Sequence, residues 1–113
     1  MTDDDKYRRK AERVVINHEF RSIEEFITEY VSDISRTGVF IRTDDPLPPG
    51  TKVDLRFTII DEDFEVIEGV GQVVRVVAVG GNAVPGMGVS FIELTPASRS
   101  LVDRVMQKRA AAT

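Results

Sequence analysis

The sequence contains no cysteine and no tryptophan, and only one of its 113 residues is a histidine. Without cysteine there are no disulfides, thiolate metal ligands, redox dithiols or cysteine nucleophiles, and a lone histidine excludes a multi-histidine zinc site. No apolar run approaches the ~18 residues that cross a bilayer, and the acidic segment Met1 to Lys6 is unlike a secretory signal. We therefore expect a cytoplasmic protein with no membrane insertion, no metal and no cofactor.

An excess of positive charge is also lacking. The 15 Lys and Arg residues against 19 Asp and Glu give a net charge of −4, which argues against a partner such as DNA, whose binding depends on phosphate neutralisation. The cations are nevertheless grouped, because residues 6–13 carry +4 and residues 99–113 carry +3, leaving −11 for the remainder. A small cationic patch on an acidic body suits a compact polyanion. A solubilising tail is the alternative interpretation of the basic run.

Signatures of catalysis are missing as well. The chain has neither a glycine-rich phosphate loop with lysine nor a nucleophile elbow. The single histidine, His18, lies on the apolar face of a predicted strand, which is typical of a core or rim histidine rather than a general base. The acidic run Asp61 to Asp63 lacks the spacing of a calcium loop. We therefore predict that the protein is not an enzyme.

Hydrophobic periodicity predicts one mainly β domain. Residues alternate between apolar and polar, or are rich in β-branched side chains, in six segments, which are 13–21, 30–34, 39–43, 51–60, 64–79 and 86–94. Gly69 and Gly71 interrupt the fifth segment and predict the bend or bulge that barrel closure requires. These features predict a six-stranded antiparallel β-barrel.

Two short segments are predicted to be helical. Ser22 and Glu25 form a capping box, which predicts a single turn through about Phe26. Thr95 and Pro96 begin a C-terminal helix of about three to four turns, in which apolar residues recur at helical spacing. We expect a domain over residues 8–109, with flexible tails at 1–7 and 110–113.

The remaining candidates for chemistry are two short motifs. Arg9 and Arg13 are four residues apart, and two guanidinium groups can grip phosphate or the O6/N7 edge of guanine and can stack on a purine. In the second motif, Asp33 can accept from guanine N1–H and N2–H, Ser35 can donate to phosphate or cap a turn, and Gly38 permits a positive φ or close ligand approach. An ordinary β-turn is the alternative interpretation of this second motif.

Taken together, the motifs and the order of elements resemble the PilZ domain family. Arg9-x-x-x-Arg13, then Asp33-x-Ser35-x-x-Gly38, a β-rich stretch with Gly86 to Phe91 and a terminal helix cover nearly the whole chain. The stretch from Phe20 to Tyr30 resembles a myxobacterial-type branch. The resemblance implies a six-stranded barrel that binds the bacterial second messenger cyclic di-GMP.

The resemblance also implies roles for single residues. Arg9 and Arg13 would hold guanine and phosphate from the N-terminal segment, and Asp33, Ser35 and Gly38 would form the fixed side on the barrel. Arg8 resembles relatives that take up a stacked nucleotide dimer, and an idle surface charge is its alternative role. We expect a cyclic di-GMP receptor that signals through an unidentified protein partner. The alternative is a nucleotide-independent adaptor of the same fold in motility or polarity regulation.

Overall fold

The computed structural model describes residues 14–60 and 63–112, which form six strands and three helical segments. The first three predicted strands are observed within one or two residues of the expected bounds, and the last one begins and ends as predicted. In chain order the elements are β1 (Val14–Phe20), α2 (Ile23–Glu25), the π-helical turn η1 (Phe26–Tyr30), β2 (Val31–Ile34), β3 (Gly38–Arg42), β4 (Lys52–Ile60), β5 (Phe64–Val77), β6 (Gly86–Leu94) and α3 (Pro96–Ala112).

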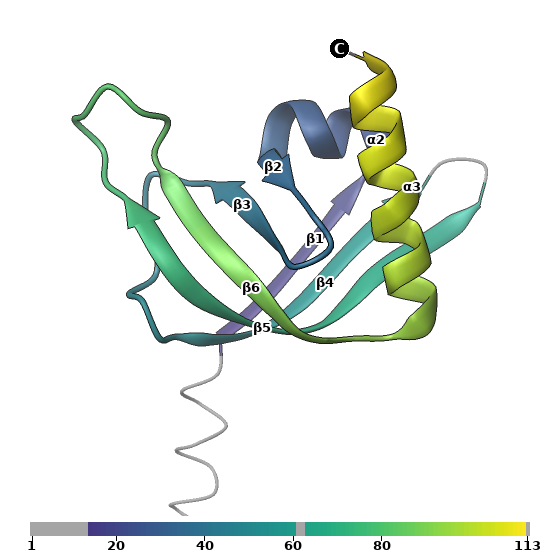
Figure 1. Ribbon diagram of the computed structural model, residues 1–113, viewed down its shortest axis with the longest axis horizontal. Coiled ribbons are helices and arrows are strands. Elements are labelled where there is room, and N and C mark those ends of the chain that lie inside the picture. Colours follow the sequence, from purple (N-terminus) through teal and green to yellow (C-terminus); the bar gives the residue numbers. More distant parts are fainter. Residues whose placement is uncertain (1–13, 61–62, 113) are drawn as a thin grey trace, which may run out of the picture.

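The strands form one mixed sheet in the order β1-β4-β5-β6-β3-β2, curled into a half-barrel (Figure 1). The prediction of a purely antiparallel sheet was wrong in one place, because β1 pairs with β4 in parallel. Tight turns force antiparallel pairing only between strands that follow one another. The chain between β1 and β4 passes through α2, η1, β2 and β3, and a connection of that length permits a parallel pair.

The hydrophobic core fills the concave side of the sheet. The inward residues of β4 were predicted from alternation, and Val53, Leu55, Phe57 and Ile59 are all at most 2% exposed. Phe26 and Tyr30 of η1 pack ring against ring with Phe20 of β1 and Phe57 of β4. Burial raises the pKa of Tyr30 to about 12. His18 is exposed at the edge of this cluster, 4.8 Å from the Tyr30 ring, which agrees with a rim position.

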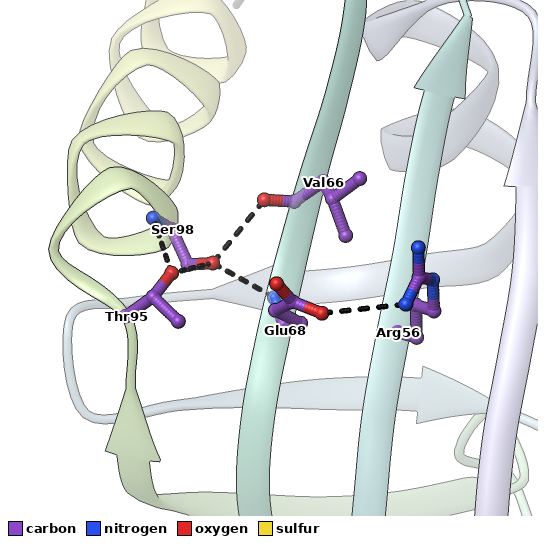
Figure 2. A network of polar contacts seen from close by, with 5 residues as sticks. All are labelled: Arg56, Val66, Glu68, Thr95 and Ser98. Atoms are coloured by element: carbon purple, nitrogen blue, oxygen red, sulfur yellow. Dashed lines mark hydrogen bonds and ion pairs between the residues drawn. The ribbon is translucent and has the colours of Figure 1, made fainter.

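A buried serine joins α3 to the sheet. β6 pairs with β5 only from Gly69 onward, so the first residues of β5 need another partner on that side. Ser98 is fully buried, and its Oγ accepts from the Glu68 amide at 2.8 Å and donates to the Val66 carbonyl at 3.2 Å (Figure 2). Thr95 Oγ1 accepts from the Ser98 amide, as expected of an N-cap. The helix thus completes the hydrogen bonding of a strand.

The helical segments are longer than predicted. Ser22 caps α2 by accepting from the Glu25 amide at 3.1 Å, as the capping box indicates, but the turn continues through η1 to Tyr30. Strand β2 therefore begins at Val31 rather than at Tyr30. At the other end, α3 has 17 residues and runs through Ala112, into the segment assigned to a flexible tail. Alanine is the best helix former, and Arg109 fixes this last turn to β2.

Within the part of the chain that the structure describes, no helix is long and apolar enough to cross a membrane.

Candidate functional site

The turn between β2 and β3 is built by Ser35 and Gly38. The Ser35 amide donates to the Gly38 carbonyl at 2.8 Å, and Ser35 Oγ accepts from the Thr37 amide at 3.2 Å. Of the two roles expected of Gly38, a positive φ is wrong, and close approach to a ligand stays a prediction. Its φ is not positive, but an added Cβ would lie 2.5 Å from the Val89 carbonyl oxygen on β6. Ser35 therefore builds the turn and Gly38 allows two strands to pack closely, and the roles of both residues toward a ligand stay predictions.

Asp33 does not belong to this turn. It lies within β2, in register with Phe40 on β3, and its side chain is 73% exposed. The register shifts between Val31 and Asp33, so Ser32 is an extra residue on this strand. Strict alternation would point Asp33 toward the core beside buried Val31, but the bulge turns it onto the outer face. The carboxylate is thus displayed to solvent without serving the turn.

A second bulge brings an arginine to the same face. The register of β5 and β6 shifts between Val73 and Arg75, so Val74 is extra and Arg75 pairs with Gly88. Val73 is buried, so alternation alone would also have turned Arg75 inward. Instead it is exposed, with its Cζ 5.5 Å from the centroid of the Phe40 ring. The two bulges place Asp33 and Arg75 at opposite ends of one row of paired residues.

This row runs Asp33, Phe40, Gly88, Arg75 across four neighbouring strands. Around it lies an open cavity of about 320 Å³. Its walls are Asp33, Ser35, Thr37, Gly38, Val39, Phe40, Val74, Arg75, Gly88, Val89 and Ser90. This volume is near the lower end of the ~300–1,000 Å³ that small-molecule sites occupy, so a dinucleotide would need further residues outside these walls.

The carboxylate of Asp33 already has one partner. Arg109 of α3 donates to Asp33 Oδ1 at 2.6 Å and, through its other terminal nitrogen, to the Ser32 carbonyl at 2.6 Å. The bulge takes Ser32 out of regular strand pairing, so this second contact satisfies its carbonyl group. Arg109 therefore stabilises the bulge and at the same time occupies one oxygen of Asp33.

The residues predicted from the sequence divide into two groups. Asp33, Ser35 and Gly38 come together in the wall of one cavity. Arg8, Arg9 and Arg13 lie outside the described residues, so their roles stay predictions. Sequence reasoning missed Phe40, Arg75 and Gly88. The glycine was visible in the Gly86-x-Gly88 pattern, but nothing in the sequence indicated that the bulge would turn Arg75 outward.

A protein-family model matches nearly the whole chain. The model described as the PilZ domain matches residues 7–108, which include both motifs and the row beneath the cavity. No curated protein was found to match the chain. The fold implied by the resemblance, a six-stranded barrel with a C-terminal helix, is confirmed in the form of a curled six-stranded half-barrel, whereas the myxobacterial-type branch stays a prediction. Because the match covers nearly the whole chain, the protein belongs to the PilZ domain family, whose members are binding and adaptor modules and in general bind cyclic di-GMP.

Proposed function

We propose that this protein is a cytoplasmic receptor for cyclic di-GMP that catalyses no reaction and passes the signal to a protein partner, for example in bacterial motility. The ligand would lie on the outer face of the half-barrel, over the cavity at the β2–β3 turn. Asp33 would accept from the guanine N1–H and N2–H groups, and Ser35 would donate to a phosphate oxygen. Arg9 and Arg13 would close over guanine and phosphate, with Arg8 available to a second, stacked nucleotide.

The observation that carries this proposal is the position of Asp33. An aspartate that served only the turn would lie in the turn and hydrogen bond to its backbone. Asp33 instead lies in β2, exposed at the rim of the cavity, with no bond from its side chain to the turn among the described residues. Its carboxylate is therefore available to a ligand, apart from the contact with Arg109 at the protein surface.

The chain before β1 is long enough for Arg9 to reach this cavity. A register row runs from Gly38 through Ser90 and Gln72 to Lys52, and Val53, the next residue along β4, pairs with Val14. Strand spacings of ~4.8 Å place the start of β1 within roughly 20 Å of Gly38, and less in a straight line because the sheet curls. Arg9 is five residues before Val14, and five residues of extended chain span at most about 18 Å. Arg9 is therefore within reach of the cavity once the length of its side chain is added, whereas Arg13 directly precedes Val14 and would meet a part of the ligand that extends toward β1.

Isothermal titration with cyclic di-GMP tests the proposal. We expect the wild type to bind, and Arg9→Ala or Arg13→Ala to weaken binding at least tenfold, because each charge-assisted contact contributes roughly 1.5–3 kcal/mol. Asp33→Ala should lose less, and Ser35→Ala less still. Lys10→Ala is the matched control, since it removes a positive charge between the two arginines without touching the motif.

Thermal unfolding of the same variants separates binding from folding. Asp33 makes no described contact with the turn, so Asp33→Ala should unfold close to the wild-type temperature. If Lys10→Ala lost as much affinity as Arg9→Ala, the weaker binding of both variants would come from net charge alone. This outcome would contradict the assigned site. A wild type that gives no heat at any nucleotide concentration would favour the nucleotide-independent adaptor.

A further inference from the structure

The floor of the cavity contains an arginine held over an aromatic ring, which neither sequence motif includes. We propose that Arg75 and Phe40 form a flat platform on which one guanine of the nucleotide stacks, with the Watson–Crick edge of the base directed along the row to Asp33. This inference rests on the proposed function and adds the residues that receive the base. The motifs supply charges and hydrogen bonds, whereas the platform supplies a planar surface.

The side chain of Arg75 is free to take this role. The distance of 5.5 Å between its Cζ and the centroid of Phe40 is within the range of a cation–π contact. Among the described residues no carboxylate pairs with Arg75, whereas Arg36, Arg56, Arg104 and Arg109 each have an acidic partner. Arg75 is also the only cation among the described residues that line the cavity. Its guanidinium group thus contacts an aromatic ring and is not engaged in an ion pair among the described residues.

Gly88 keeps the platform continuous. It lies between Phe40 and Arg75 in the row, and a Cβ at this position would be 3.4 Å from Arg75 Cβ and 3.9 Å from Phe40 Cδ2. These are ordinary contact distances, so the backbone tolerates a small side chain here. A branched side chain would extend between the guanidinium group and the ring. The absence of a side chain at Gly88 therefore allows Arg75 to reach Phe40.

The geometry favours a base over a phosphate as the group that meets Arg75. A guanidinium group above a ring is planar and weakly hydrated, so it offers a surface on which a purine can stack. Asp33 is one strand beyond Phe40 in the same row, about 5 Å away by strand spacing, and its oxygens accept from N1–H and N2–H of guanine. The corresponding edge of adenine presents an acceptor at N1, which a carboxylate repels. One row thus provides both stacking and recognition of the base.

The experiment is isothermal titration of cyclic di-GMP into four variants. Arg75→Ala should weaken binding about tenfold, in the range of one lost stacking contact. Arg75→Lys should lose nearly as much, because lysine keeps the charge but has no planar face. Gly88→Val should also weaken binding. Arg99→Ala is the matched control, since Arg99 is exposed and unpaired among the described residues but lies outside the cavity.

The outcomes distinguish this inference from the proposed function. Wild-type affinity in Arg75→Lys would assign Arg75 to a phosphate and overturn the stacking platform, as would equal affinities of Arg75→Ala and Arg99→Ala. In either case binding by the wild type would leave the receptor function intact. Failure of the wild type to bind would overturn both. Unchanged thermal unfolding of Arg75→Lys would show that its lost affinity is not a loss of fold.

Discussion

At the scale of single residues, Gly38 has a structural role that does not depend on the candidate ligand site. Its backbone lies against β6, and the space for a side chain is taken by the Val89 carbonyl oxygen. The same residue begins β3 and closes the turn that carries Ser35. A glycine at this position therefore allows β3 to pack closely against β6, whether or not the glycine contacts a ligand.

Gly38→Ala should destabilise the fold. A Cβ 2.5 Å from a backbone oxygen forces β3 and β6 apart, and overpacking of this kind costs about 1–3 kcal/mol of unfolding free energy. Urea denaturation followed by circular dichroism measures this loss. Gly81→Ala is the control, because its Cβ would have no atom within 4 Å and its stability should not fall. Equal midpoints for the two variants would contradict the packing role of Gly38.

At the scale of elements, α3 is tied to the site by side-chain ion pairs. Two of them involve residues of the segment Asp33 to Gly38, because Arg36 donates to Asp103 at 3.0 Å and Arg109 to Asp33 at 2.6 Å. Lys108 also donates to Glu24, 3.0 Å away, and this hydrogen bond lowers the pKa of that carboxyl. The last turns of α3 are therefore held by the same strand and turn that would meet the nucleotide.

Arg109 should compete with the ligand for Asp33. Arg109→Gln keeps an N–H donor for the Ser32 carbonyl but removes the positive charge that pairs with the Asp33 carboxylate, so affinity for cyclic di-GMP should rise a few-fold, the worth of one exposed ion pair. Arg109→Ala should gain affinity as well but lose some thermal stability, because the carbonyl group at the bulge loses its partner. Titration and thermal unfolding measure the two effects. Weaker binding in both variants would show instead that Arg109 orients the carboxylate for the nucleotide.

At the scale of the whole molecule, the sheet has a core face and an outer face that carries the candidate cavity. The concave face is filled by the apolar cluster, while the candidate cavity lies on the outer face between β2 and β5. Charge is also unevenly distributed along the sequence, because residues 6–13 carry +4 and residues 99–113 carry +3 while the remainder carries −11. A compact dianion is attracted by such an arrangement, whereas a long phosphate chain is repelled by the body.

Stoichiometry tests the use of the basic N-terminal segment. Arg8, Arg9 and Arg13 provide three guanidinium groups where the two phosphates of one nucleotide need about two, so a second, stacked molecule has a partner in Arg8. Titration should saturate near two nucleotides per chain. Arg8→Ala should saturate at one, with first-site affinity within about a factor of ten of the wild type, and Lys10→Ala should still reach two. Saturation of the wild type at one would make Arg8 an idle surface charge.

Local sequence patterns were sufficient for the strands and for half of the site. Alternation of side chains determines which residues of β4 are buried, and Ser22 and Glu25 mark the start of a helix through hydrogen bonds that span only three or four residues. The segment Asp33 to Gly38 was recognised because its residues are close in sequence. Such features depend on neighbours along the chain, and the sequence by itself contains those neighbours.

The tertiary structure alone decided the direction of β1 against β4, the length of the helical segments and the outward position of Arg75. The bulge at Val74 lies in the pairing of β5 with β6, and it reverses the face that alternation assigns to Arg75. Phe40 reaches Arg75 only through the pairing of both strands with Gly88, and Arg109 reaches Asp33 across 76 positions of sequence. These contacts join distant segments, so they exist only once the sheet and α3 have packed together.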